Sequence, residues 1–424
     1  MRRRQWHQET AIGFVSTRFA GTDGVSLETA KWADILTRFG FECFYFAGES
    51  DRPPERSYVV EEAHFDHPDI RAVHADLFDD YIRSPKTSRA IQRLTQFLKR
   101  HLYRFVRTFG IRLLIVENAL SLPMNVPLGL ALTELIAETN QRTIAHHHDF
   151  YWERHRYALS AAMDYLRAAF PPALPSICHV VINSFAAQQL ALRTGNGSVL
   201  IPNVMDFDTP PPEPDAYAIA LRPELGIAAD EFLLLQPTRI VPRKRIEHAI
   251  ELARRLDAPC VLVISHEAGD EGHAYEAYLR EYARLVGVRV LFASDRIHYD
   301  RGLTADGRKI FSLADAYQQA NLVTYPSLVE GFGNAFLETI YYRRPIVMST
   351  YEIFKTDIQP KGFRVIGFDE FIDDNTVREA RAVLYDPNRA KEMVDHNYEL
   401  GRRYYSYRAL ERRLAALVDQ CLGA

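Results

Sequence analysis

Short apolar segments alternate with amphipathic segments along the whole chain, and this alternation limits the possible folds more than any other feature. Helix-like segments such as Leu27–Phe39 and Ile246–Leu256 separate the apolar runs. A first series of candidate strands covers Ile12–Ser16, Glu42–Ala47, Ser57–Val60, Arg112–Val116, Arg142–His146, His179–Asn183 and Ser198–Ile201. A second series covers Phe232–Gln236, Cys260–Ile264, Val288–Phe292, Leu322–Tyr325 and Pro345–Met348. Strands that alternate with helices form β-α-β units, so we predict an α/β protein with two Rossmann-like parallel-sheet domains.

A proline-rich segment separates the two series. It reads TPPPEPD from Thr209 to Asp215, and prolines at this density do not fit inside a helix or strand. We interpret it as an interdomain linker, with an N-terminal domain over residues 1–205 and a C-terminal domain over residues 206–400. Apolar and basic residues alternate at helical spacing over Arg408–Leu422, which predicts an amphipathic helix in a closing segment, residues 401–424.

Composition narrows the class of protein. The 424 residues are 47% apolar and 25% charged, which is typical of a globular enzyme with a sizeable core. A net charge of -4 gives no reason to expect nucleic-acid binding. No apolar run approaches the ~20 residues that span a bilayer, and Arg2 to Arg4 alone do not make a stable membrane contact. The oligomeric state is left open.

The four cysteines predict a reducing compartment. Cys43, Cys178, Cys260 and Cys421 are far apart in the sequence and form no C-x-x-C pair. We therefore expect a cytoplasmic protein with neither a disulfide framework nor a thiolate metal site.

The loop after Leu322–Tyr325 has the strongest signature of a ligand site. In open parallel sheets, ligands bind beyond the carboxyl ends of the strands. The sequence there continues as PSLVEGFGNAFLE, a glycine-containing turn followed by the start of a helix. Gly331 and Gly333 allow the backbone to approach a ligand closely. Glu330 and Glu338 are eight residues apart, a rise of ~12 Å on a helix, which suits the two ends of an extended, hydroxyl-rich ligand.

A basic loop follows Phe232–Gln236 in the same way. Arg239 and Lys244 in this loop are able to converge on a phosphate, the arginine as a bidentate fork and the lysine as a point charge. A solvated basic loop is the alternative. We favour the phosphate site because it accompanies the Glu330 loop.

The histidines after Arg142–His146 raise the question of a metal. Consecutive residues on a strand point to opposite faces, and no carboxylate or cysteine pattern completes a ligand set in the sequence. Asp206 and Asp208 read D-x-D but lie beside the proline-rich segment. We therefore expect no bound metal, and we expect His148 to form hydrogen bonds in a cleft.

Two further loops follow strands of the first domain. Gly21 and Gly24 open a helix after Ile12–Ser16, but neither the dinucleotide fingerprint nor a P-loop is present. Glu117-Asn118 follows Arg112–Val116, where it serves either an acceptor or simply the loop. The residues that we expect on the acceptor side are Asp23, Asn118, Asp149 and Tyr151.

Taken together, these motifs resemble the retaining GT-B glycosyltransferases of family 4, which include sucrose-phosphate synthase, bacterial mannosyltransferases and relatives of glycogen synthase. The resemblance covers almost the whole chain. It is carried by Gly21 and Gly24, His148, Pro202-Asn203, Arg239 and Lys244, Tyr325-Pro326-Ser327, and the E-x7-E pair Glu330 and Glu338. One departure is that Thr22-Asp23 separate glycines that are often adjacent in the family.

The resemblance implies the fold and a role for each residue. Two Rossmann-like domains would face a deep interdomain cleft. The resemblance implies that Arg239 and Lys244 bind the donor diphosphate, Glu338 the ribose and Glu330 the transferred sugar. The backbone of Gly331, Phe332, Gly333 and Asn334 would cradle the hexose, and Gly24 of the first glycine loop would also bind the donor. His148 would contact the sugar from the N-terminal, acceptor-side domain.

The implied reaction is retaining transfer of a hexose, glucose or mannose, from a nucleotide-diphosphate sugar to a small acceptor. The fixed cations would replace a divalent metal, so we expect no cofactor besides the donor. Arg154 and Arg156 suit an anionic or sugar-like acceptor. The alternatives are a sugar-nucleotide epimerase, which would turn over donor without acceptor, and a non-catalytic carbohydrate- or nucleotide-binding protein.

Overall fold

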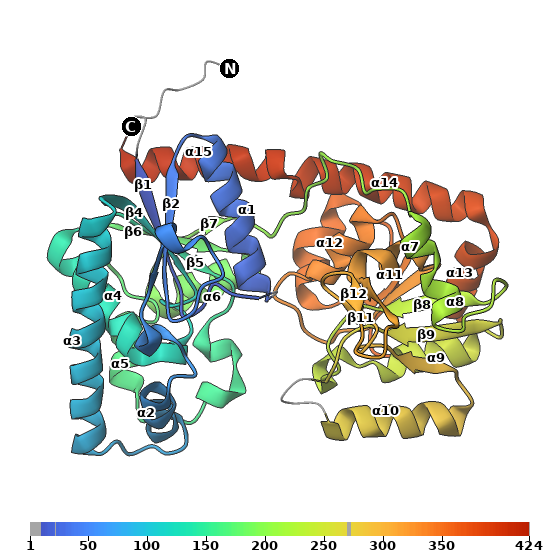
Figure 1. The fold of residues 1–424 in the computed structure, drawn as a ribbon, viewed down its shortest axis with the longest axis horizontal. Coiled ribbons are helices and arrows are strands. Elements are labelled where there is room, and N and C mark those ends of the chain that lie inside the picture. Colours follow the sequence, from blue (N-terminus) through green and yellow to red (C-terminus); the bar gives the residue numbers. More distant parts are fainter. Residues whose placement is uncertain (1–9, 22, 269–272, 424) are drawn as a thin grey trace. The chain divides into compact units, whose positions relative to one another are not determined.

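Two compact units make up the computed structural model, which describes residues 10–21, 23–268 and 273–423 (Figure 1). The first unit comprises Met1–Asn203 with Leu410–Ala424, and the second comprises Val204–Ala409. The proline-rich segment belongs to the second unit, where Gln318 Nε2 donates a hydrogen bond of 2.9 Å to the carbonyl of Pro212. The division therefore falls a few residues before the prolines.

The first unit is built on a seven-stranded sheet with the order β3-β2-β1-β4-β5-β6-β7, in which all pairs are parallel. Its strands are β1 (Ala11–Val15), β2 (Glu42–Ala47), β3 (Ser57–Val59), β4 (Ile111–Glu117), β5 (Thr143–His147), β6 (Ile177–Val181) and β7 (Val199–Leu200). Its helices are α1 (Gly24–Arg38), α2 (Pro68–Phe78), α3 (Pro85–Thr108), α4 (Val126–Thr139), α5 (Met163–Ala169), α6 (Ser184–Thr194) and most of α15 (Tyr407–Leu422).

Helix α3 shows how local sequence and packing agree. Ser84 caps its N-terminus by accepting a hydrogen bond of 3.1 Å from the amide of Thr87, and Pro85 occupies the first helical position. Its buried stripe, which includes Leu98 and Phe105, packs with α4 against alternate residues of the sheet. Such burial is worth about 25 cal/mol per Å² of apolar surface. The amphipathic pattern thus fixes which face of α3 meets the core.

The second unit repeats the architecture with a six-stranded parallel sheet of order β10-β9-β8-β14-β15-β16. Its strands are β8 (Phe232–Gln236), β9 (Cys260–Ile264), β10 (Val290–Phe292), β14 (Leu322–Tyr325), β15 (Ile346–Ser349) and β16 (Ile366–Phe368). Its helices are α7 (Ala216–Ile219), α8 (Leu221–Glu224), α9 (Glu247–Arg255), α10 (His273–Val286), α11 (Leu313–Gln319), α12 (Asn334–Tyr341), α13 (Asp374–Tyr385) and α14 (Pro387–Tyr405). Helices α9, α10 and α13 share one apolar core with this sheet.

The predicted α/β class with two Rossmann-like parallel sheets is confirmed. All twelve expected strands are present within one or two residues, and the expected helix over Arg408–Leu422 is α15. Strand β16 is not among the predicted strands, and neither is a small sheet of β11 (Ile297–His298), β13 (Lys309–Ser312) and β12 (Gly302–Leu303). These strands have two to four residues, too short for a periodic pattern.

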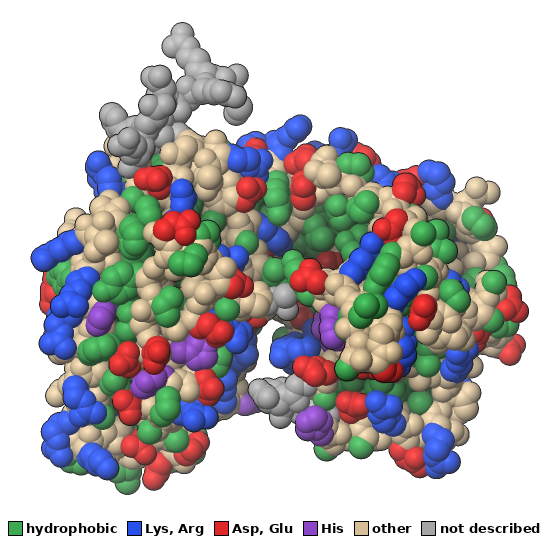
Figure 2. All heavy atoms as spheres, in the orientation of Figure 1, with side chains coloured by type: hydrophobic (Ala, Val, Ile, Leu, Met, Phe, Trp, Pro, Cys, Tyr) green, Lys and Arg blue, Asp and Glu red, His purple; other side chains and the backbone are tan. Residues whose placement is uncertain are grey.

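Two observations describe the helices and the visible surface. None of the described helices is long and apolar enough to cross a membrane. Figure 2 shows Lys and Arg interspersed with Asp and Glu on the visible face of each unit.

Candidate active site

The strand order of the second unit reverses between β8 and β14, and the predicted donor loops follow these two strands. A crevice at such a reversal is where open parallel sheets bind ligands. The loop after β8 carries Arg239 and Lys244, and the loop after β14 carries Glu330. The two loops are joined because the amide of Leu328 donates to the carbonyl of Arg243 over 2.9 Å.

Lys244 and Glu330 form an ion pair at this reversal. Lys244 Nζ contacts Glu330 Oε1, and Arg243 lies 3.7 Å from the other carboxylate oxygen. The side chains of Lys244 and Glu330 are only 10% and 11% exposed. Burial lowers the pKa of Lys244, while the Glu330 charge acts in the opposite direction. Separate roles are predicted for these two residues from the sequence, but in the structure they form one charged group.

Arg239 remains available for an anion. Its side chain is exposed and makes no hydrogen bond or ion pair with the described residues, although its carbonyl accepts a hydrogen bond of 3.1 Å from the amide of Val241. Its charge acts on Lys244 and on His266, which follows β9. Glu330 is the carboxylate that contacts Lys244, and it does not contact Arg239. The two cations Arg239 and Lys244 therefore keep a net positive charge, which suits a diphosphate.

His266 is a polar residue of this region that the sequence analysis missed. Burial, together with the charges of Arg239 and Lys244, lowers its pKa to about 4, so its imidazole is neutral at pH 7. Ser265 Oγ lies 2.9 Å from His266 Nδ1. Its position after β9, next to β8 in the sheet, is the signal that would have revealed it.

The turn before α12 depends on Gly333. This residue has φ of 107°, and a Cβ atom there would lie 2.5 Å from Tyr351 Oη. Tyr351 Oη in turn donates a hydrogen bond of 2.7 Å to the carbonyl of Phe332. Only glycine combines this backbone with this neighbour. The cradle implied over Gly331 to Asn334 is thus held by a buried tyrosine.

Glu338 lies on α12 and has its own partner. Its carboxylate accepts a hydrogen bond of 2.8 Å from Tyr317 Oη, and Tyr317 is fully buried. Tyr317 of α11 therefore orients the second carboxylate of the E-x7-E pair.

The strand order of the first unit reverses between β1 and β4. Ser16, after β1, donates a hydrogen bond of 3.2 Å to the carbonyl of Glu117 at the end of β4. Asn118 has a left-handed φ of 58°, and its side-chain oxygen accepts a hydrogen bond of 2.8 Å from the amide of His148. Asn118 thus has a structural role in holding the His148 backbone.

Glu117, His146 and His148 converge next to this reversal. Glu117 Oε2 lies 2.9 Å from His146 Nδ1 and 3.1 Å from His148 Nε2. Burial raises the pKa of Glu117, but the two imidazoles outweigh it and lower that pKa to about 2. Burial lowers the pKa of both histidines, and the Glu117 charge reverses this effect for His148, whose pKa is raised.

This cluster corrects one premise of the sequence analysis. We expected no carboxylate to complete a ligand set with the histidines, but Glu117 does so from the neighbouring strand. Residues i and i+2 of an extended segment share a face, so His146 and His148 act together while His147 points away. The residue pairing Glu117 with His146 across β4 and β5 places the carboxylate on that same face.

The other residues expected on the acceptor side have local partners. Asp23 is the N-cap of α1 and accepts hydrogen bonds from the amides of Val25 and Ser26, while Gly24 is the first residue of the helix. Asp149 pairs with Arg154 at 2.5 Å. These contacts show Asp23 and Asp149 in structural roles, and their roles in binding stay predictions.

The aromatic residues of this segment divide into core and surface. Phe150 is fully buried and stacks on Trp152, with ring centroids 4.5 Å apart. Tyr151 is half-buried. Phe150 is therefore a packing residue, and Tyr151 remains the candidate for an acceptor contact.

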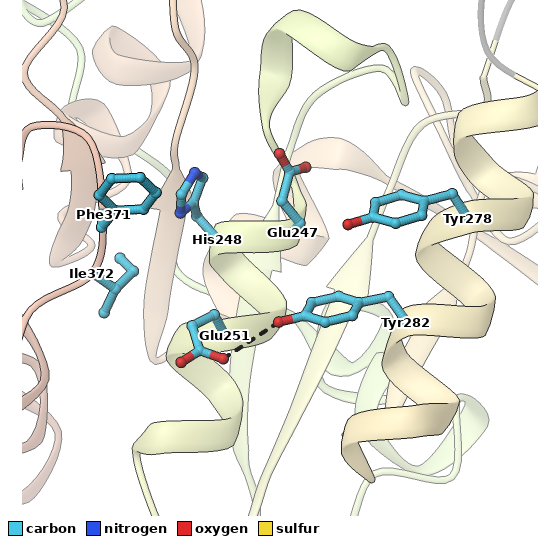
Figure 3. A pocket seen from close by; sticks show the side chains of 7 residues that line it. All are labelled: Glu247, His248, Glu251, Tyr278, Tyr282, Phe371 and Ile372. Carbon is cyan, nitrogen blue, oxygen red and sulfur yellow. Dashed lines mark hydrogen bonds between the residues drawn. The ribbon is translucent and has the colours of Figure 1, made fainter.

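A separate pocket of about 320 Å³ opens in the second unit (Figure 3). Its lining comes from α9, α10 and the loop after β16 and consists of Glu247, His248, Glu251, Tyr278, Tyr282, Phe371 and Ile372. Tyr282 Oη and Glu251 share a hydrogen bond of 3.4 Å across it. None of the predicted site residues lines this pocket.

Comparison with known proteins agrees with this fold. No family model matches the sequence. The chain is 32% identical over 436 residues to mannosylglucosylglycerate synthase of Thermotoga maritima, covering 94% of this chain and 97% of that protein. It is 31% identical over 445 residues to the enzyme of the same name from Petrotoga mobilis, covering 93% and 98%.

Solved structures with low sequence identity share the architecture. Sucrose-phosphate synthase from Thermosynechococcus elongatus has a TM-score of 0.66 at 17% identity, covering 98% of this chain and 99% of that one. HepE of Anabaena in complex with UDP-glucose has a TM-score of 0.64 at 13% identity, covering 97% and 99%. The chain therefore belongs to the mannosylglucosylglycerate synthase family and is a hexosyltransferase of the GT-B fold.

Proposed function

We propose that this protein transfers a mannosyl group from GDP-mannose, with retention of configuration, to a hydroxyl group of glucosylglycerate or a similar small anionic glycoside. The observation that carries the proposal is the near full-length similarity to two mannosylglucosylglycerate synthases. The name of those relatives describes mannose added to a glucose–glycerate unit. Proteins of similar fold that hold UDP or UDP-glucose support a nucleotide-sugar donor.

The second unit supplies the groups for the donor in this proposal. Arg239 and Lys244 neutralise the diphosphate, and their charge stabilises the transition state more than the ground state because negative charge grows on the leaving group. The fixed cations take the place of a divalent ion at the diphosphate. Glu330 lies beside these cations, where its charge also favours positive character on the sugar ring.

The first unit supplies the groups for the acceptor. Glu117, His146 and His148 offer buried hydrogen-bonding atoms beside the strand reversal, and the carboxylate of a glycerate unit suits a cationic side chain such as the exposed Arg156. Retention follows from attack on the same face from which the diphosphate leaves, as expected for this family.

A donor and acceptor panel tests the proposal. Purified protein is incubated with one of three donors, GDP-mannose, GDP-glucose or UDP-glucose, each with and without glucosylglycerate as acceptor. A further reaction combines UDP-glucose with glycerate, with and without glucosylglycerate. Products are identified by mass spectrometry and NMR. We expect an α-linked mannosyl product only with GDP-mannose and the glycoside acceptor. A β-linked product would contradict retention. Donor conversion without any acceptor would favour an epimerase and overturn the transferase assignment.

Metal independence at the diphosphate is tested by binding. Calorimetric titration with GDP in excess EDTA should give the same affinity as titration in Mg²⁺. Loss of GDP binding in EDTA, restored only by Mg²⁺ or Mn²⁺, would contradict the role assigned to Arg239 and Lys244.

A further inference from the structure

The cluster of Glu117, His146 and His148 has the geometry of a metal site. Three atoms, one from each side chain, lie within 4.8 Å of one another, and they come from the end of β4, from β5 and from the residue that follows β5. The carboxylate oxygen is 2.9 Å from one imidazole nitrogen and 3.1 Å from the other. Two bonds of ~2.1 Å at the tetrahedral angle place their ligand atoms about 3.4 Å apart, so a widening of these contacts by a few tenths of an ångström admits an ion.

Hydrogen bonding alone does not account for this cluster. Glu117 is 0% and His146 is 1% exposed. Among the described residues, Glu117 Oε1 and His146 Nε2 lack a hydrogen-bond partner, while His146 Nδ1 has only the carboxylate of Glu117 beside it, 2.9 Å away. Each unpartnered buried polar group costs about 1–3 kcal/mol, so a missing ligand is the simplest cause.

The surrounding charge favours a cation. Glu28 of α1 is 1% exposed, and its charge acts on both His146 and His148. One of its oxygens pairs with Lys31 at 2.9 Å, and the other has no hydrogen bond among the described residues. Two carboxylates therefore act on the imidazole pair, while Trp32 stacks on the His146 ring at 4.3 Å and fixes its orientation.

We propose that Glu117, His146 and His148 bind one divalent transition-metal ion. Two imidazole nitrogens and one carboxylate oxygen suit Mn²⁺, Co²⁺ or Zn²⁺, whereas Mg²⁺ and Ca²⁺ prefer all-oxygen ligands. Three protein ligands leave positions open for oxygen atoms of another molecule.

The open positions bind hydroxyl or carboxylate oxygens of the acceptor, a role that rests on the proposed function. A metal ion orients such oxygens and holds their charge in place. The ion is held by residues of the first unit only. Binding of the donor diphosphate then needs no metal ion, whereas binding of the acceptor uses one.

Metal binding itself is the first test. Protein stripped with EDTA and freed of chelator is titrated with Co²⁺, Mn²⁺ and Zn²⁺ by calorimetry, and Co²⁺ binding is followed by visible absorption. We expect one ion per chain. Glu117→Gln and His148→Asn should each weaken Co²⁺ binding by at least about 100-fold, since even outer-shell changes cost 10- to 100-fold. The nearly isosteric Glu117→Gln keeps the packing, and circular dichroism verifies folding. His155→Asn, an exposed histidine of the same segment, is the matched control and should bind as the wild type does.

Two results would overturn the inference: no ion bound by the stripped wild type at saturating Co²⁺, or unchanged binding in both variants. Activity separates this inference from the proposed function. Stripped protein should keep its GDP affinity but show a raised KM for the glycoside acceptor. Mannosyl transfer without metal binding would refute the metal site alone, whereas one bound Co²⁺ without transfer from any donor would refute the proposed function alone.

Discussion

At the scale of single residues, the two carboxylates of the E-x7-E pair have different partners, so their substitution should change different kinetic constants. Glu330→Gln should lower kcat by about 100-fold, because its charge is needed where positive character develops on the sugar. Glu338→Gln should mainly raise the donor KM by roughly tenfold, because the ribose hydroxyls that it would bind do not change charge during transfer. Steady-state kinetics with varied donor distinguishes the two. Glu352→Gln, an exposed carboxylate of the same unit, should change neither constant.

Wild-type kcat and donor KM in both carboxylate variants would refute the E-x7-E assignment. The contact between Glu330 and Lys244 adds a second check. If the pair acts as one charged group, Lys244→Ala combined with Glu330→Gln should cost less than the sum of the single changes.

Lys244 should contribute to both donor binding and turnover. Lys244→Ala removes the buried cation that we propose for the diphosphate and leaves Glu330 without its main partner. We expect GDP affinity to fall by about 10- to 100-fold and kcat to fall with it. Calorimetry with GDP and steady-state assays measure the two effects. Lys391→Ala, on the exposed surface of α14, serves as the control. Unchanged affinity and turnover in Lys244→Ala would remove this residue from the site.

At the scale of elements, the start of α12 depends on one glycine. Gly333→Ala faces both a positive φ and a contact with Tyr351 Oη, whereas Gly362→Ala faces a φ of 93° with its nearest neighbour at 3.9 Å. The backbone effect alone costs roughly 1 kcal/mol, so Gly333→Ala should lower the free energy of unfolding by more than Gly362→Ala does. It should also weaken GDP binding, which Gly362→Ala should not. Urea unfolding and calorimetry measure these effects.

A second substitution tests whether the contact with Tyr351 Oη causes the loss of stability. Tyr351→Phe in the Gly333→Ala background should recover part of the lost stability. Equal stability and equal GDP affinity for the two glycine variants would show that the turn tolerates a side chain.

At the scale of the whole molecule, each unit has its own core, and a buried histidine pair makes the first unit sensitive to acid. His147 Nε2 lies 2.9 Å from His179 Nδ1, and both side chains are buried. Burial lowers the pKa of His147 well below its usual value and that of His179 to about 4. A histidine with a lowered folded pKa stabilises the fold above pH 6.5, and this stability is lost as the pH falls towards 4. For His179 the loss is about 3 kcal/mol.

Tryptophan fluorescence isolates this effect, because Trp32 and Trp152 lie in the first unit and residues 204–409 contain no tryptophan. The free energy of unfolding of the first unit, measured by urea unfolding with fluorescence detection, should fall as the pH is lowered from 6.5 to 4. His179→Gln should reduce that dependence, and the exposed His155→Gln should not. An unchanged pH dependence in His179→Gln would contradict the neutral, buried state of this histidine.

The sequence by itself determined the two parallel sheets and the order of their strands along the chain, because apolar runs and helical periodicity are local signals. It also singled out the two loops that we propose for the donor, since a turn rich in glycine and charge after a buried strand can be recognised from consecutive residues. Very short strands such as β16 were not predicted, because three residues are too few to show a hydrophobic periodicity.

Only the tertiary structure decided which side chains meet. The pairing of Lys244 with Glu330 joins residues from two loops, and the cluster of Glu117 with His146 and His148 depends on the pairing of β4 with β5. Asp23 is the cap of α1, which the sequence did not reveal, and its role at the acceptor stays a prediction. Neighbouring strands of a parallel sheet are separated in sequence by whole helices, so their register, and with it every contact across them, is fixed by packing and not by local pattern.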